Sequence, residues 1–301
     1  MNTLNILIKR NIKLFFKDKG MFFTALITPA ILLVLYVSFL GNVYTDSLTL
    51  ALPEGFVISD KLMKGFAGAQ LTSSLLSVSC VTVAFCSNML MVQDKANGTL
   101  RDLTVSPVRP SVMAMGYYAA TLSSTLIVCL CASVICFVYL ALTAWYLSVV
   151  DVILLLIDVV LLCLFGVAVS SVINFFLSSQ GQISAVGTII SSGYGFISGA
   201  YMPLSQFSDE LRTAVTLLPG TYGTALVRNH ALRGVLAQME SEGLPTEFVD
   251  EVRDNFDCTL YLFENKIEIP AMYAVMICTV VLLVAAYVVM NIIKSRKVRK
   301  K

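Results

Sequence analysis

The chain has 301 residues, of which 57% are apolar and only 13% are charged, and its mean hydropathy is +0.82. Soluble domains carry about 45–50% apolar and about 25% charged residues, so a water-soluble two-domain protein is excluded. The 21 basic and 19 acidic residues lie in blocks between long uncharged stretches. Lipid is therefore expected to be the main solvent of this chain.

Residues 1–20 predict an amphipathic helix. One of its faces holds Leu4, Ile8, Ile12 and Phe15, and another holds Lys9, Lys13 and Lys17. A helix of this kind lies in the membrane interface with its lysines toward anionic headgroups.

Six further stretches are long and apolar enough to cross the hydrocarbon core, which takes about 20 residues. They are Met21–Leu40, Gln70–Val92, Ser111–Ala141, Val152–Leu177, Ile183–Tyr201 and Ala271–Ile293. Their length excludes the roughly ten-residue alternating strands of a membrane barrel. The predicted fold is thus an all-α membrane protein with six transmembrane helices, five within 21–201 and the sixth at 271–293.

The charges indicate the orientation of these helices. The two ends and the even-numbered connections hold 14 basic residues against 3 acidic ones, whereas the connections 41–69 and 202–270 hold 7 against 14. Excess Lys and Arg marks the cytoplasmic side, so both termini and the basic tail 294–301 are expected there.

Residues 202–270 are expected to form an extracellular helical segment. Helix-like pieces lie at 208–218 and 247–256, and 221–236 is apolar enough to dip into the outer leaflet. The only histidine, His230, lies between two arginines and is expected at a surface or interface.

Two kinds of reactive side chain give weak signals. Asp158 is the acid deepest in a predicted span, so it is either functional or placed in the interface near Asp151. Seven of the eight cysteines lie in apolar stretches and are expected to be packing residues, and no CxxC pair or second histidine predicts a metal site.

The stretch 94–108, between the second and third spans, is the most specific feature. Asn97-Gly98 predicts a turn, Thr99 a helix cap, and Ser106-Pro107 a helix end. The result is a short stiff helix between two spans, with Leu100 and Leu103 on one side. A helix of this kind suits mechanical contact with a cytoplasmic partner, although a polar connection without a partner would give the same spacing.

This stretch resembles the Gly-Thr-x-x-x-Leu-x-x-(Ser/Thr)-Pro-(Val/Leu) signature of type-2 ABC transporter permeases, here Gly98-Thr99, Leu103 and 106–108. The sequence SGAYMPL at 198–204 and LPGTY at 218–222, with Arg228 following, is similar to further elements of the family. Two departures are Gln93, where many members have an acid, and the acidic stretch 240–257.

The resemblance implies a permease that pairs with a second permease and is driven by two cytoplasmic ABC ATPase subunits. ATP and magnesium would be bound by those partners, since this chain has no G-x-x-x-x-G-K-[ST] phosphate loop and is not itself an enzyme. The residues expected to couple to the ATPase are Asp94, Gly98, Thr99, Leu100, Arg101, Asp102, Leu103, Ser106 and Pro107. The implied activity is export of an amphipathic or hydrophobic substrate across a bacterial cytoplasmic membrane, with no nucleic-acid partner.

Two further sets of residues are expected to serve this function. Small residues recur every four positions along the fifth span and predict a close helix contact, between subunits or within one: Gly187, Ser191, Gly195 and Gly199. In the resembled family the second and fifth helices border the substrate path, which here implicates Ser73, Ser77, Asn88, Tyr194 and Phe196. Hydroxyls that bond back to their own helix are the alternative explanation of the serines.

Two other classes of protein are weaker alternatives. A membrane enzyme would need a nucleophile with a base or paired carboxylates. An ion-coupled carrier or channel would be expected to show an internal repeat and a charged network, neither of which the sequence contains.

Overall fold

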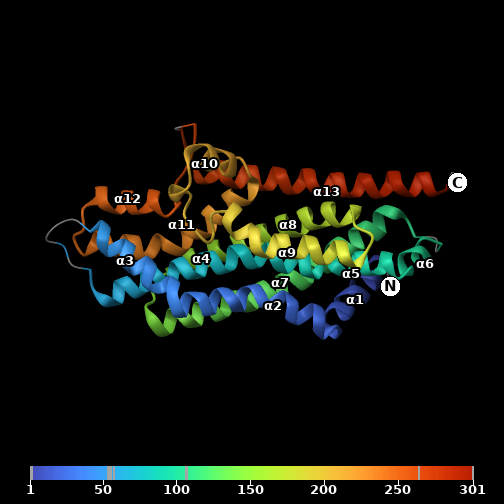
Figure 1. The fold of residues 1–301 in the computed structure, drawn as a ribbon, viewed down its shortest axis with the longest axis horizontal. Coiled ribbons are helices and arrows are strands. Elements are labelled where there is room, and N and C mark those ends of the chain that lie inside the picture. Colours follow the sequence, from blue (N-terminus) through green and yellow to red (C-terminus); the bar gives the residue numbers. More distant parts are fainter. Residues whose placement is uncertain (1–2, 53–55, 57, 106–107, 264, 300–301) are drawn as a thin grey trace.

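A computed structural model describes residues 3–52, 56, 58–105, 108–263 and 265–299 of the chain. The chain forms an elongated helical bundle (Figure 1). Its helices are α1 (Thr3–Lys17), α2 (Lys19–Leu35), the π-helix η1 (Tyr36–Leu40), α3 (Gly41–Ala51), α4 (Asp60–Ser87), α5 (Met89–Ala96), α6 (Thr99–Val105), α7 (Pro110–Thr143), α8 (Val149–Phe176), α9 (Gln180–Ile197), the 3-10 helix η2 (Leu204–Gln206), α10 (Asp209–Thr216), α11 (Pro219–Ser241), α12 (Thr246–Asn255) and α13 (Ile269–Arg299).

The two ends of the bundle differ. Helix α1, helix α6 and the last turns of α13 lie at one end, here called the α6 end, while α3 and α12 lie at the opposite, α12 end (Figure 1). Near the start of α13, β1 (Leu260–Leu262) pairs antiparallel with β2 (Asn265–Ile267). The α1 and α13 ends of the chain therefore lie on the same side.

Five helices of the described residues are long and apolar enough to cross a membrane: Lys19–Leu50, Asp60–Ala96, Pro110–Thr143, Val149–Phe176 and Ile269–Arg296. These correspond to five of the six predicted spans. The other predicted span, 183–201, is largely α9, which runs along α4 and α5 but is not among the five. Helix α9 is rich in Gln, Ser, Thr and Gly, so a six-span arrangement stays a prediction.

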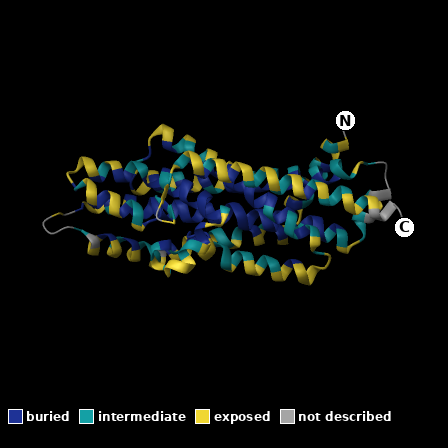
Figure 2. Ribbon diagram, turned by 90° about the horizontal axis from the view of Figure 1, so that it is seen from above, coloured by how far each residue is buried: buried dark blue, intermediate teal, exposed yellow. Residues whose placement is uncertain are grey.

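Helix α4 is the centre of the bundle. It packs against α2, α7, α8, α9 and α11, and every residue from Gly65 to Ser87 is buried (Figure 2). Its many Gly, Ala and Ser residues allow this, because small side chains let neighbouring helix backbones approach closely. Ser73, Ser77 and Asn88 of the second predicted span accordingly face protein of the same chain.

Helix α11 is inserted into the bundle. The predicted outer segment does contain the short helices α10 and α12, but α11 packs on α4, α8 and α13 and is buried over most of its length. The apolar stretch 221–236 therefore lies against protein helices. The connection predicted at 41–69 is also largely helical, because α3 continues from α2 through the π-helical turn η1.

Helix α1 docks on α7. Its buried residues are Leu7, Asn11 and Phe15, and an added Cβ at Gly116 of α7 would lie 3.2 Å from the Cβ of Leu7. Lys9, Lys13 and Lys17 are exposed, as the amphipathic pattern predicts, whereas Leu4, Ile8 and Ile12 are only half-buried. The buried stripe is rotated from the predicted one toward α7.

Replacing Gly234 by alanine tests the insertion of α11. A Cβ at this position would overlap the backbone carbonyl oxygen of Tyr146, so α11 and the connection before α8 would have to separate. Overpacking of this kind typically costs about 1–3 kcal/mol. We expect the thermal unfolding midpoint of the purified Gly234→Ala variant to fall by several degrees. In the control, Gly181→Ala, nothing lies within 4 Å of the added Cβ, and an equal drop there would contradict the close approach.

Candidate functional site

A large groove runs along one face of the subunit, between α2–α3 on one side and α9 on the other. Its volume is about 1410 Å³, and α2 and α9 both lie on the near face of the bundle in Figure 1. Residues of α4 and α5 and of the segment before η2 also line it, and Val252, Asn255 and Phe256 belong to its wall at the α12 end. The groove thus extends from the neighbourhood of Asp18 to α12.

The walls of the groove differ in chemistry. On α2 and η1 it is lined by large apolar side chains that are about half exposed, such as Ile27, Ile31 and Phe39. On α9 it is lined by Ser184, Thr188 and Ser192, and each of these hydroxyls donates to the carbonyl four residues before it. Their oxygens can still accept hydrogen bonds. The groove therefore suits a ligand or helix with both apolar and polar surface.

The four small residues of the predicted α9 ladder do not share one role. Gly187 and Ser191 line the groove. Gly195 is buried, and the ring of Tyr201 from the same chain occupies the space beside it. Gly199 lies beyond the end of α9 with φ +71°, in the left-handed region that favours glycine at a helix end. Half of the ladder is therefore used within the subunit, and its other half faces the groove.

Of the predicted path residues, only Phe196 lines the groove, where its side chain is half exposed. Ser73 and Ser77 are buried in α4, and the Ser73 hydroxyl donates to the carbonyl of Gln70. Tyr194 is turned toward the start of α11, where an added Cβ at Gly220 would lie 2.9 Å from its hydroxyl oxygen.

Asn88, the remaining path residue, is also buried and ties α4 to α8. Its Nδ2 donates to the hydroxyls of Ser170 and Ser171, both at 3.0 Å. Its backbone carbonyl accepts a hydrogen bond from Asn174. Asn88 therefore joins two helices of one subunit in this structure.

The predicted short helix after the second span is present as α6. Helix α5 ends at Ala96 with Asn97 as its C-cap, and Gly98 has φ +80°, which lets the chain turn into α6. Leu100 and Leu103 are half-buried and pack against the apolar cluster formed by α4, α5, α7, α8 and α13. Asp102 is exposed.

Leu100 and Leu103 therefore attach α6 to the bundle. Thr99 begins the helix and Arg101 lies within it. Ser106 and Pro107 lie outside the described residues.

Asp94 is bound inside the subunit. Arg10 of α1 donates to it through both terminal nitrogens, at 2.8 and 3.2 Å, and the Tyr117 hydroxyl of α7 donates at 2.6 Å. Hydrogen bonding to Asp94 raises the pKa of the Arg10 guanidinium. Because the Asp94 carboxylate is buried, it is placed to position the segment before α6 by joining α1, α5 and α7.

Lys95, the next residue, fixes the same segment to α8. Its ammonium donates to the carbonyls of Asn174, Phe175 and Leu177 at 2.7 to 3.1 Å. Basic side chains near a helix C-terminus satisfy carbonyls that have no partner within the helix. Neither this link nor the Arg10–Asp94 contact was predicted from sequence.

The expectation that His230 lies at a surface is wrong. Its Nδ1 lies 2.6 Å from Oδ2 of Asp158, and both side chains are buried. Tyr273 of α13 donates to the other carboxylate oxygen. The insertion of α11 brings this histidine to α8, so Asp158 has a buried partner that was not predicted from the sequence.

Asp151 lies at the start of the same helix. It closes a capping box with Ser148 and pairs with Arg233. None of the residues around Asp158 or Asp151 lines the groove. In this arrangement they join α8, α11 and α13.

A buried ion pair holds the exit from α9. Arg228 donates to Oδ2 of Asp257 at 3.0 Å and to the carbonyl of Gly199 at 2.8 Å, and the same carboxylate oxygen accepts from the backbone of Leu204. Burial raises the pKa of Asp257 to about 6, and the charge of Arg228 opposes that rise. Arg228 follows the LPGTY sequence noted above. Nothing in the acidic stretch 240–257 distinguished Asp257, its partner, from the other acidic residues there.

Replacing Arg228 by methionine should be strongly destabilising and dependent on pH. Breaking a buried pair typically costs about 3–5 kcal/mol, because a charge is left without a partner. The pKa of Asp257 is higher in the folded state than in the unfolded chain. Protonation of Asp257 therefore adds to the free energy of unfolding. That gain is complete below the pKa of the unfolded chain and is lost as the pH rises through about 6. Without Arg228 the folded pKa should rise further, and the loss of thermal midpoint should be smaller at pH 5 than at pH 8.

The matched control is Arg253→Met, because Arg253 lies on α12 and is about one-third exposed in its pairs with Glu240 and Asp250. Its effect should be small at both pH values. A loss in Arg228→Met that does not change with pH would contradict the role assigned to Asp257.

The contact between Asp158 and His230 can be tested by a double-mutant cycle. Asp158→Asn and His230→Gln should each lower the thermal midpoint, and the double variant should lose less than the sum of the two. Residues in direct contact typically show interaction energies of about 0.5–3 kcal/mol. Asp151→Asn combined with His230→Gln is the control and should be additive; additivity in both cycles would show that Asp158 and His230 do not interact.

The comparisons with known proteins agree with these features. Residues 2–231 match the family described as ABC-2 type transporter, which is most of the chain and includes α1 to α9. No curated protein matches the chain. The match confirms the resemblance to type-2 ABC permeases, and the five apolar helices make the chain a multi-pass membrane protein. The chain belongs to the ABC-2 type transporter family and is a membrane subunit of an ABC transporter.

Proposed function

We propose that the chain is the permease subunit of an ATP-driven exporter, in which two such subunits form a path for an amphipathic or hydrophobic substrate such as a drug, peptide or lipid. The observation that carries this proposal is the groove of about 1410 Å³ between α2–α3 and α9. Pockets for single small molecules are typically about 300–1,000 Å³. A groove of this size that is open along its length can be half of a larger cavity closed by a second subunit.

The chemistry of the groove supports the substrate class. Apolar side chains of α2 would contact the apolar part of a substrate, and the hydroxyls of Ser184, Thr188 and Ser192 would accept hydrogen bonds from its polar part. The described lining contains a single charged residue, Asp18, at the α6 end. Such a lining favours substrates that partition into membranes.

The energy source would be a pair of cytoplasmic ABC ATPase subunits that bind ATP and magnesium and contact α6. Basic residues are concentrated in α1, around α6 and at the end of α13, which supports a cytoplasmic α6 end and cytoplasmic termini in a bacterial membrane. A push on α6 would be passed to the bundle through Leu100 and Leu103, and to α1, α7 and α8 through Asp94 and Lys95. Alternating access would follow from opening and closing of the groove between the two subunits.

The test is uptake of an amphipathic fluorescent dye into inside-out vesicles that contain the permease and its cognate ATPase. We expect uptake only with ATP and with both proteins. Thr188→Trp should remove most of it while the ATPase still co-purifies, because the indole would fill the groove. The control is Ile277→Trp, at an exposed position on α13 outside the groove.

Two outcomes would overturn the proposal. Uptake driven by an ion gradient in the absence of the ATPase would favour the ion-coupled carrier. Equal inhibition by Thr188→Trp and Ile277→Trp would show that the groove has no special part in transport.

A further inference from the structure

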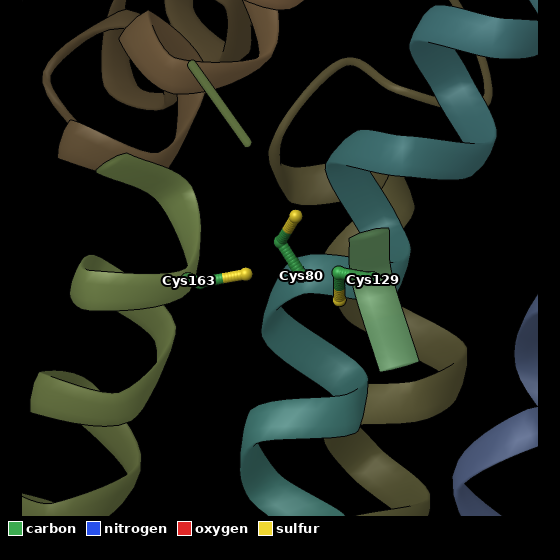
Figure 3. A group of neighbouring side chains, drawn as sticks. All are labelled: Cys80, Cys129 and Cys163. Atoms are coloured by element: carbon green, nitrogen blue, oxygen red, sulfur yellow. The ribbon is translucent and has the colours of Figure 1, made fainter. Parts of the chain in front are cut away.

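Three cysteines that are far apart in the sequence meet in the centre of the bundle. Cys80 of α4, Cys129 of α7 and Cys163 of α8 have sulfur atoms that all lie within 4.8 Å of one another. Figure 3 shows that they come from three separate helices and that the Cys163 side chain points toward the other two. All three have no exposed surface and none is in a disulfide.

The composition of this cluster limits what it can bind. It offers three sulfur ligands, and no carboxylate or imidazole of the described residues belongs to the group. Soft sulfur ligands select Cu(I), zinc and iron–sulfur clusters. Structural zinc sites take four ligands, and iron–sulfur clusters are held by four cysteines or by a mixed set with histidine. Three sulfurs without a fourth ligand fit a three-coordinate Cu(I) ion best.

We propose that Cys80, Cys129 and Cys163 form a binding site for one Cu(I) ion inside the permease subunit. Two of the thiols lose their protons to solvent when the ion binds, so that two thiolate bonds form, and the third sulfur completes the coordination as a neutral thiol. The copper stays in the Cu(I) state throughout, and no electron is transferred. The thiol of Cys80 gives up its contact with the carbonyl of Val159, at 3.7 Å.

The position of the site indicates its role. None of the three cysteines lines the groove, so the ion is held apart from the proposed substrate path. The cluster lies where α4, α7 and α8 pack against one another, and Gly166, one turn from Cys163, lets α8 approach the backbone of α4 at Cys80. A bound ion therefore fastens three helices of the core together, and the subunit is more stable with copper than without it.

The test is an anaerobic titration of the purified full-length chain with Cu(I), in competition with a chromogenic chelator. Cys131 and Cys278 are the exposed cysteines of the described residues, so both are replaced by serine in every sample. We expect one equivalent of Cu(I) per chain, a higher thermal midpoint when it is bound, and an X-ray absorption spectrum with sulfur ligands only.

Cys129→Ala should weaken binding by more than about 100-fold, since even residues that only support metal ligands are worth 10- to 100-fold in affinity. The matched control is Cys86→Ala, a buried cysteine on the same helix as Cys80, which should bind Cu(I) unchanged. Cys80→Ala and Cys163→Ala repeat the test should Cys129→Ala not fold, as judged by gel filtration.

Three results would overturn the proposal. They are the absence of stoichiometric Cu(I) binding, equal affinity in a folded cluster variant and in Cys86→Ala, and a spectrum with nitrogen or oxygen ligands. Tighter binding of Zn(II) than of Cu(I) by the wild-type cluster would overturn the choice of ion.

Discussion

The close packing of α4 is the constraint on which the rest of the structure depends. No lipid reaches a helix that is surrounded by other helices, so protein side chains must fill the space around it. The neighbouring helices must therefore approach its backbone closely. Small residues on both sides make this possible, as at Gly166 of α8, where an added Cβ would lie 2.9 Å from the Cys80 carbonyl oxygen. Because α11 takes one side of α4, it is drawn into the bundle together with its charged residues. The Arg228 charge then pairs with Asp257, and the His230 ring lies against the carboxyl group of Asp158.

The covered side of α4 contrasts with the uncovered sides of α2 and α9. Both of these helices expose large apolar side chains, such as Ile31 and Phe196. A purely apolar surface needs only lipid to cover it. The surface of α9 also carries hydroxyl groups, and in this it differs from the mainly apolar surface of α13. A face with this mixed chemistry beside a long groove is what the proposed pairing with a second subunit would require.

The parts of the fold that follow from local sequence could be predicted, and those that depend on distant contacts could not. Hydropathy over about 20 residues identifies the five long apolar helices. The Asn97-Gly98 turn and the helix that starts at Thr99 can be predicted from a few neighbouring residues. The depth of α11 was underestimated because its apolar face is interrupted by Arg228, His230 and Arg233, whose partners lie 29 to 82 residues away in the chain. The candidate site was predicted in part. Phe196, Gly187 and Ser191 line the groove, but Ser73, Ser77 and Asn88 are turned to other helices of the subunit. The spacing of residues along a helix shows which of them share a face, but it does not show which neighbouring helix that face contacts.

Asp94 and Lys95, near the end of α5, connect the segment before α6 to three other helices. Asp94 is bound to α1 and α7, and Lys95 is bound to the end of α8. Helices α1, α5, α7 and α8 are therefore joined through two neighbouring residues. Under the proposed coupling, a force applied at α6 would be passed to all four helices together. Helix α9 is joined to α8 by the short stretch Leu177–Ser179. Any rotation of α9 relative to these helices would have to be absorbed by the backbone torsions of these three residues and by the packing of α9 on α4 and α5.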